Sequence, residues 1–222
     1  MPSYSLGDIQ LVLPDALLTP LIQRMLEKGW YEVEEAKALR AHLRDDDRVL
    51  ELGGGAGFLA TLCALKVGAQ NVATVEANPT MLPIIRENLE RNGQGGADVL
   101  HGAVLSSSGL ATTDFYIPEA FWAATLEQSG KGAVRQVSVP VWPLSDLLQR
   151  YAPTVLIVDV EGAEKDYFEG MLPSGLRLIV IELHPDAYAR DIIGVLFARL
   201  AAQGFIYQPK GSQGAVVVFE RL

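Results

Sequence analysis

Short apolar runs alternate with longer stretches of helical length along most of this chain. The apolar runs predict buried strands at residues 48–52, 71–75, 98–102, 154–158 and 176–181. The longer stretches predict helices at residues 15–27, 33–43, 58–66 and 79–92. Strands that alternate with helices are typical of an α/β fold, in which a mostly parallel sheet carries helices on both faces.

The same pattern divides the chain into regions. Residues 1–46 are predicted to form an N-terminal helical prelude that also holds a short strand at residues 9–13. Residues 47–222 form the main domain, and β-rich segments within about 111–141 mark an inserted strand pair. Residues 205–220 hold two more strands, which we expect to pair as an antiparallel hairpin.

The first strand of the main domain ends in an acid and breaks into a glycine-rich turn. Glycines let a backbone take positive φ and approach a ligand closely, because no Cβ stands in the way. Strand, glycine turn and helix form the first crossover of a nucleotide-binding sheet, with the ligand outside the carboxyl ends of the strands. The alternative is that the glycines serve only the geometry of the turn and bind no ligand. The residues expected to bind the ligand are Glu51, Gly53, Gly54, Gly55, Gly57 and Phe58.

The spacing of these glycines argues against a dinucleotide. The dinucleotide fingerprint needs a third glycine where Phe58 stands, so a nicotinamide-dependent oxidoreductase is only an alternative. The stretch from Glu51 to Gly57 has the form E-x-G-G-G-x-G, which resembles the first motif of S-adenosylmethionine-dependent methyltransferases. That cofactor has an ammonium group, which a nearby carboxylate would attract.

The second strand of the main domain runs directly into Glu76. This acid falls about twenty residues past the glycine turn, where a ribose-binding carboxylate is expected. Glu76 can accept hydrogen bonds from both ribose hydroxyls, and Ala77 and Asn78 lie beside it. Asn78 followed by Pro79 also matches a helix N-cap and a first helical position, so we expect a helix to start there.

Two later strands end in acids at the same edge of the sheet as the glycine turn. Asp159 and Glu161 follow one strand, and Glu182 and His184 follow the next. Alternation along an extended chain places the two members of each pair on one side. Asp159 has the strongest functional claim, because an acid at the end of a buried strand is otherwise costly to place. Glu161 and Glu164 could equally serve only to place negative charge in the first turn of a following helix. His184 could equally be a loop histidine with no catalytic role.

Five motifs together resemble those of the FkbM-type methyltransferases, at residues 49–58, 75–79, 102–109, 158–164 and 181–184. The most specific of them is the sequence Asp-Val-Glu-Gly-Ala-Glu that begins at Asp159. The resemblance implies a Rossmann-like class I methyltransferase fold and S-adenosylmethionine as the methyl donor. It also implies methylation of a hydroxyl group on a sugar or a polyketide-like product.

The resemblance further assigns residues to the cofactor. Tyr31 and Glu32 belong to a segment that it implies closes over the cofactor, and Ala103, Val104 and Asp159 are implied to contact it. The chain departs from the family in its lean prelude and in an acceptor-binding segment that we match to no member.

Methyl transfer from a sulfonium is an in-line displacement, in which the enzyme holds acceptor oxygen, methyl carbon and sulfur collinear. A protonated alcohol is a poor nucleophile, so a base within hydrogen-bond reach would help. We expect His184 to be this base, with Asp159 orienting it and Glu161 as a third catalytic residue. No metal is expected. The rival use of these residues, together with Glu182, is to hold one divalent cation that binds a diol acceptor.

Charge and composition limit the partners. The formal net charge of −9 argues against a nucleic-acid partner, because phosphates call for a basic patch. The chain has no run of roughly twenty apolar residues and no basic and apolar leader, so we expect a cytoplasmic protein with no membrane partner. Cys63 is the only cysteine and lies in an apolar helical run, which predicts a buried thiol.

The acceptor is expected to be a small molecule with a hydroxyl group, and a homodimer is the assembly we consider. Tyr116, Phe121, Trp122 and Trp142 offer flat apolar surface for the acceptor, although such aromatics more often pack in a core. A protein or nucleic-acid methyltransferase is the nearest alternative, but no amine-binding Asn-Pro-Pro-aromatic motif stands at Asp159. A non-catalytic relative of the fold is the other alternative.

Overall fold

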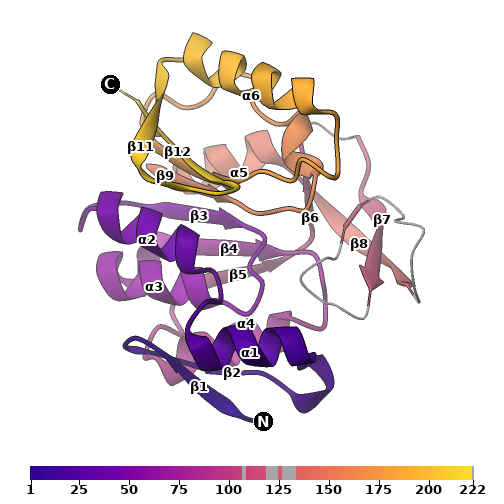
Figure 1. The fold of residues 1–222 in the computed structure, drawn as a ribbon. Coiled ribbons are helices and arrows are strands. Elements are labelled where there is room, and N and C mark those ends of the chain that lie inside the picture. The colour runs from indigo at the N-terminus through magenta and orange to yellow at the C-terminus, as the bar shows by residue number, and fades with distance from the viewer. Residues whose placement is uncertain (107–108, 119–124, 127–133, 222) are drawn as a thin grey trace.

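A seven-stranded sheet forms the centre of the computed structural model, which describes residues 1–106, 109–118, 125–126 and 134–221. The strands of this sheet are β3 (Val49–Leu52), β4 (Val72–Glu76), β5 (Asp98–His101), β9 (Val155–Val158), β10 (Leu178–Glu182), β11 (Phe205–Gln213) and β12 (Val216–Arg221). Their order is β11-β12-β10-β9-β3-β4-β5 (Figure 1). The strands from β10 to β5 are parallel, whereas β12 and β11 form an antiparallel hairpin at one edge. The expected α/β fold with its C-terminal hairpin is confirmed.

Helices cover both faces of this sheet (Figure 1). The helices on one face are α2 (Val33–His42), α3 (Phe58–Val67) and α4 (Leu82–Arg91). The helices on the other face are α5 (Leu144–Tyr151) and α6 (Arg190–Ala202). Neighbouring strand residues point to opposite faces, so Val49 joins the core under the first set of helices and Leu50 joins the core under the second.

The N-terminal region holds more than helices. It opens with the antiparallel strands β1 (Ser3–Leu6) and β2 (Ile9–Val12), continues through the 3-10 turn η1 (Asp15–Leu17), and reaches α1 (Pro20–Lys28). Strand β1 is not predicted from the sequence, because only one of its residues is buried. Helix α1 begins later than predicted, because the Thr19 side chain caps it by accepting a hydrogen bond from an N–H of its first turn.

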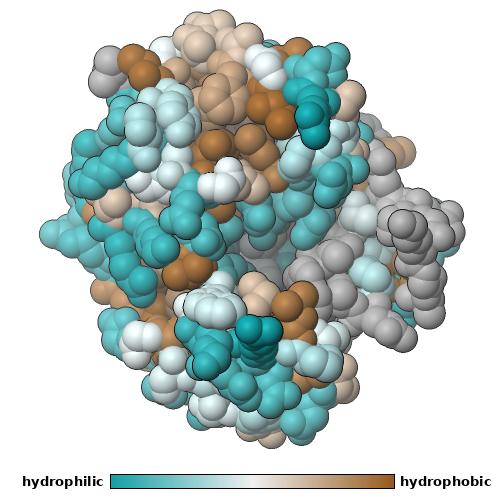
Figure 2. All heavy atoms as spheres, in the orientation of Figure 1, coloured by the Kyte–Doolittle hydropathy of each residue, from teal (hydrophilic) through white to brown (hydrophobic). Residues whose placement is uncertain are grey.

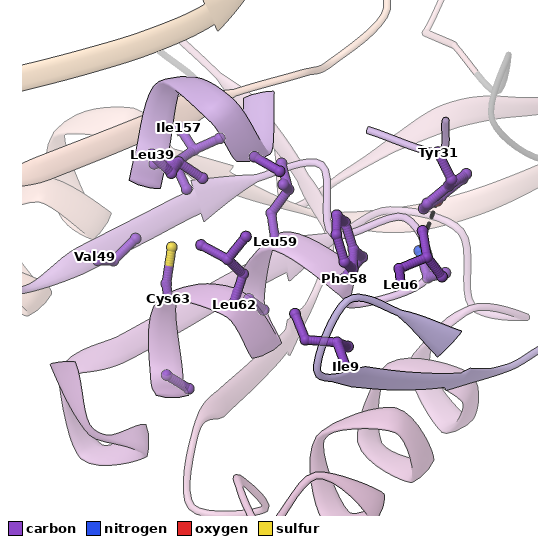
Figure 3. Packing of buried hydrophobic residues seen from close by; sticks show 14 of the residues in the cluster. Leu6, Ile9, Tyr31, Leu39, Val49, Phe58, Leu59, Leu62, Cys63 and Ile157 are labelled. Carbon is purple, nitrogen blue, oxygen red and sulfur yellow. Dashed lines mark hydrogen bonds between the residues drawn. The ribbon is translucent and has the colours of Figure 1, made fainter. Parts of the chain in front are cut away.

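This N-terminal hairpin shares a core with the glycine-turn helix. Leu6 and Ile9 of the hairpin belong to the same buried cluster as Phe58 and Leu62 of α3, and Figure 3 shows these side chains directed toward one another. Cys63 lies in the same cluster and is fully buried, as expected.

Asn88 of α4 joins the hairpin to the glycine turn. Its side-chain oxygen accepts a hydrogen bond from the Val12 N–H (2.7 Å), and its side-chain nitrogen donates to the carbonyls of Val12 (3.1 Å) and Ala56 (2.9 Å). Asn88 is completely buried. Asn88 therefore links three separate segments: the N-terminal hairpin, α4 and the glycine turn.

The start of α4 differs from its prediction. The helix begins at Leu82, and Asn78 is not its N-cap. The Asn78 side chain instead accepts a hydrogen bond from the Thr80 N–H (3.1 Å), and the Asn78 carbonyl accepts one from the Met81 N–H (3.0 Å). A separate turn therefore stands between β4 and the helix.

A small second sheet lies beside the main one. It consists of β6 (Ala103–Leu105), β8 (Val134–Pro143) and β7 (Thr112–Pro118) in that order, with β6 parallel and β7 antiparallel to β8. Two further 3-10 turns, η2 (Ala69–Asn71) and η4 (Ala163–Asp166), complete the elements described. In the part of the chain that the structure describes, no helix is both long and apolar enough to cross a membrane.

Replacing Asn88 with Ala should lower the free energy of unfolding by about 3 kcal/mol or more, because it leaves three buried backbone groups without partners. Asn92→Ala is the matched control, since Asn92 also bonds the backbone of β2, at Gln10, but at a more exposed position. We expect the control to lose about 1 kcal/mol. Urea unfolding measures both values, and equal losses in the two variants would contradict the role given to Asn88.

Candidate active site

A cavity of about 280 Å³ lies at the carboxyl ends of the parallel strands. Figure 2 shows the surface hollowed near the centre of the view, beside these strand ends. The cavity is lined by many of the residues singled out from the sequence: Tyr31, Glu32, Gly53, Gly55, Glu76, Ala77, Ala103, Val104, Asp159 and Glu161. Glu182 lines it as well, whereas other residues singled out do not: Glu51, Gly54, Gly57, Phe58, Asn78, Glu164 and His184.

The glycine turn is pressed against the end of β9. A Cβ on Gly53, which has a φ of +92°, would stand 1.7 Å from the carbonyl oxygen of Asp159. Backbone atoms cannot yield to such a clash, so only glycine allows the ends of β3 and β9 to approach this closely. The approach brings the turn and the acidic strand end to the same cavity.

Glu76 holds the glycine turn from the side of β4. One of its carboxylate oxygens accepts a hydrogen bond from the Gly55 N–H (3.0 Å), and the other accepts one from the Asn78 N–H (2.6 Å). Burial raises the pKa of Glu76 to about 7, against the opposing effect of these hydrogen bonds. Glu76 also lines the cavity, so its carboxyl group borders the space open to a ligand.

Glu51 lies behind the turn rather than on the cavity. It is 1% exposed, and its Oε2 has no hydrogen-bond partner among the described residues. Burial raises the pKa of Glu51 to about 8, and the charges of Glu76 and Asp159 add to the effect. A direct contact between Glu51 and a ligand is therefore not supported by its position.

Tyr31 and Glu32 cover the turn from the N-terminal side. The Tyr31 hydroxyl accepts a hydrogen bond from the Ala56 N–H (3.3 Å), and its ring packs edge-on against Phe58 (Figure 3). Glu32 has a left-handed backbone with a φ of 48°. Its Oε1 and the Tyr31 hydroxyl lie 3.0 and 3.1 Å from the point where a Cβ on Gly55 would stand, so both border the turn.

His184 stands behind the acids of the cavity. Its Nε2 lies 3.5 Å from Asp159 Oδ1 and 3.6 Å from Glu161 Oε2, and its Nδ1 lies 2.9 Å from Glu164 Oε1. The alternation expected along the chain ends with the strand, because Glu161 has a left-handed backbone (φ 53°). Asp159 and Glu161 nevertheless both line the cavity, whereas in the second pair Glu182 lines it and His184 does not.

The charges around His184 determine its protonation. Burial alone would lower its pKa, but the hydrogen bond to Glu164 and the charges of Asp159, Glu164 and Glu161 raise it to about 9. Burial would likewise raise the pKa of Glu164, yet His184 holds it below its usual value. In the free protein at neutral pH, the ring is therefore an imidazolium paired with a buried carboxylate.

Glu35 is a site residue that the sequence does not reveal. It lies on α2, is 6% exposed, lines the cavity and interacts with Glu182. Burial raises the pKa of both carboxyl groups to about 7; Glu182 adds to the rise at Glu35, and the charge of Asp159 adds to the rise at Glu182. In the sequence, Glu35 stands beside another acid, Glu34, on a helix, which suggests a solvent-exposed position. The packing of α2 near β10 brings it to the site instead.

None of the aromatic residues expected at the acceptor pocket is found on the cavity among the described residues. Tyr116 and Trp142 do not line the cavity, and the Trp142 ring N–H donates to the His101 carbonyl (3.0 Å). Phe121 and Trp122 lie outside the described residues. Apolar residues that the sequence does not single out line the cavity instead: Ile22, Met25, Met81, Phe115 and Leu126.

Comparisons with known proteins agree with this geometry. The profile of the methyltransferase FkbM domain matches residues 54–207. The release factor glutamine methyltransferase of Chlorobaculum tepidum is 27% identical over 173 residues, which are 69% of this chain and 52% of that protein. The ribosomal protein L11 methyltransferase of Thermus thermophilus is 46% identical over 57 residues, which are 26% of this chain and 22% of that protein. The chain thus spans about half or less of the length of these relatives.

Solved structures share the fold. The precorrin-6y C5,15-methyltransferase of Geobacter metallireducens superposes with a TM-score of 0.52 at 12% identity, over 96% of this chain and 94% of that one. Trm1 of Pyrococcus horikoshii, solved with S-adenosyl-L-methionine, superposes with a TM-score of 0.51 at 10% identity, over 99% of this chain and 60% of that one. Both similarities concern the fold alone.

The raised pKa of Glu51 predicts a pH-dependent stability. The folded state holds a proton that the unfolded state releases, so the stability from this group is present below pH 4.5 and is lost as pH rises through about 8. Glu51 should contribute a decline of at most about 1.4 kcal/mol per pH unit in that range.

Glu51→Gln should make this decline shallower, because the amide stays neutral. Urea unfolding at pH 5, 6.5 and 8 measures the slope, and the exposed residue Glu90, changed to Gln, is the control. An unchanged slope in Glu51→Gln would refute the assignment.

Proposed function

Since this chain belongs to the methyltransferase FkbM domain family, we propose that it transfers a methyl group from S-adenosylmethionine to a hydroxyl group of a small molecule. S-adenosylmethionine is its cofactor. The observation that carries the proposal is the cavity itself, which has the Glu76 carboxylate beside the glycine turn at one side and Asp159 and Glu161 at the other.

The cavity residues suit the parts of this cofactor. Glu76 is the acceptor for the two ribose hydroxyls, and the backbone of Gly53 and Gly55 lets the cofactor come close. Ala103 and Val104 offer small apolar surfaces against which the adenine ring can lie. Tyr31 and Glu32 belong to the segment that closes over the cofactor, and Asp159 contacts it, as the family resemblance implies.

The charge of the cavity supports a cationic donor and an uncharged acceptor. Seven carboxylates line it, and its described lining residues include no Lys, Arg or His. A sulfonium is stabilised by the ionised form of these acids, whereas an acceptor that carries phosphate is repelled by it. This argues for a neutral hydroxyl compound and against a nucleic acid.

Glu161 is the best placed proton acceptor for the hydroxyl. It lines the cavity, whereas His184, the base expected from the sequence, is separated from the ligand space by the carboxylates that its Nε2 faces. The left-handed backbone of Glu161 is costly for a residue with a side chain, and such strain is concentrated at functional sites. In this proposal His184 and Asp159 position Glu161 and the acceptor.

A protein acceptor is the second candidate, because both relatives described above are named for protein substrates. Screening of acceptors distinguishes the two candidates. Transfer to hydroxylated small molecules supports the first, and transfer only to protein supports the second.

The cofactor assignment predicts the result of calorimetric titrations. S-adenosylhomocysteine should bind and NADH should not. Glu76→Ala should weaken S-adenosylhomocysteine binding by about a hundredfold or more, since two charge-assisted hydrogen bonds of roughly 1.5 to 3 kcal/mol each are lost. Because Glu76 also holds Gly55, Glu76→Gln serves as a size-matched variant, and circular dichroism verifies that each variant is folded. Binding of NADH alone would overturn the proposal.

The base assignment predicts a split between binding and rate. With an acceptor found by screening, Glu161→Gln should keep S-adenosylhomocysteine affinity and lower kcat by about 10² to 10⁴. Asp186→Asn, an exposed acid on the following loop, is the control and should keep both values. A Glu161→Gln enzyme with the kcat of the wild type would remove Glu161 from the role.

A further inference from the structure

Asp159, Glu182 and His184 meet where two neighbouring parallel strands end. Val158 of β9 stands opposite Ile181 of β10, so Asp159 and Glu182 are the next residue on each strand. One ligand atom from each of the three residues lies within 4.8 Å of the other two. Atoms bonded to one ion at about 2.1 Å stand about 3 to 4.2 Å apart, so small shifts would bring all three onto a common ion.

A buried carboxylate fixes the orientation of the His184 ring. Glu164 is completely buried, and its Oε1 lies 2.9 Å from His184 Nδ1. Glu164 also accepts hydrogen bonds from the N–H groups of Gly162 (2.8 Å) and His184 (3.1 Å), so its own position is firm. Because a carboxylate only accepts, Nδ1 carries the donated proton and Nε2 is directed at the cluster. Metal-binding histidines are held by carboxylates in this way.

The Nε2 atom has carboxylate oxygens near it but at long range. The distances of 3.5 Å to Asp159 and 3.6 Å to Glu161 exceed the roughly 2.7 to 2.9 Å of a charge-assisted hydrogen bond. Asp159 Oδ1 is shielded from solvent and has no hydrogen-bond partner among the described residues. An unpaired buried carboxylate oxygen is costly, and a cation that displaces the Nε2 proton to solvent and bonds both Nε2 and Oδ1 would satisfy it.

Among the described residues, the acids around this cluster have little positive charge beside them. Asp159 and Glu182 line the cavity with five further acids, and none of its described lining residues is basic. His184, which lies just behind, is the nearest described group able to carry a positive charge among these acids. A divalent ion would offset more of the negative charge than one imidazolium does.

We propose that Asp159, Glu182 and His184 bind one divalent first-row transition-metal ion, for which Mn²⁺ serves as the probe. Imidazole together with carboxylates suits first-row transition metals, whereas Mg²⁺ and Ca²⁺ prefer sites made of oxygen alone. Since Asp159 and Glu182 face the cavity, the remaining coordination positions of the ion are directed toward the ligand space. Cation binding at these residues does not depend on the acceptor proposed above.

Titration of chelator-treated protein with Mn²⁺, Mg²⁺ and Ca²⁺ tests this site, with calorimetry for affinity and electron paramagnetic resonance for bound Mn²⁺. One Mn²⁺ should bind per chain, more tightly than either other ion. Glu182→Gln and His184→Gln should each weaken Mn²⁺ binding at least tenfold, whereas Asp186→Asn should not change it. Mn²⁺ should also raise the Tm of the wild type and leave that of Glu182→Gln nearly unchanged.

Absence of Mn²⁺ binding in the wild type, or equal affinity in all variants, would overturn the site. Glu182→Gln removes one like charge from the cluster, so it should remain folded, and circular dichroism verifies this. Titration of the same samples with S-adenosylhomocysteine separates the two proposals. Cofactor binding without Mn²⁺ binding removes only the metal site, and Mn²⁺ binding without cofactor binding removes only the proposed methyl transfer.

Discussion

The close approach of two strand ends, β3 and β9, sets the geometry on which the rest of the site depends. Gly53 and the Asp159 carbonyl stand so near that no side chain fits between them. This contact places the cofactor turn and the acidic strand end on one cavity, and the parallel order of β10, β9, β3 and β4 adds Glu182 and Glu76 from either side. The chemistry of the site is thus a consequence of strand order and one missing Cβ.

That geometry has an electrostatic cost. Acidic side chains crowd a partly buried space, where burial raises the pKa of Glu51, Glu76 and Asp159, and neighbouring acids add to the rise at Glu51 and Asp159. Like charges held together store free energy that a positively charged ligand releases. The site therefore weakens the free protein in order to favour a cationic ligand, which is a frequent compromise at functional sites.

The sequence predicted those parts of the structure that follow from the periodicity of apolar residues and the spacing of turn residues. The strands, the glycine turn and the terminal hairpin follow from apolar runs and turn residues, and the resemblance to FkbM-type methyltransferases is confirmed by the match over residues 54–207. Helix starts were wrong where a side chain such as Asn78 closed a turn of its own. Glu35 and the direction of the His184 ring were out of reach, because both depend on contacts between segments far apart in the chain.

Asn88 connects the N-terminal hairpin with the cofactor turn through hydrogen bonds to Val12 and Ala56. Local opening of the hairpin breaks the Val12 bonds that orient the Asn88 amide toward Ala56, so the hairpin and the turn share one support. A ligand that stabilises the turn would therefore also slow amide exchange in β2, because it favours the form in which this shared support is intact. Protection of the first strands would then report occupancy of a site that those strands do not line.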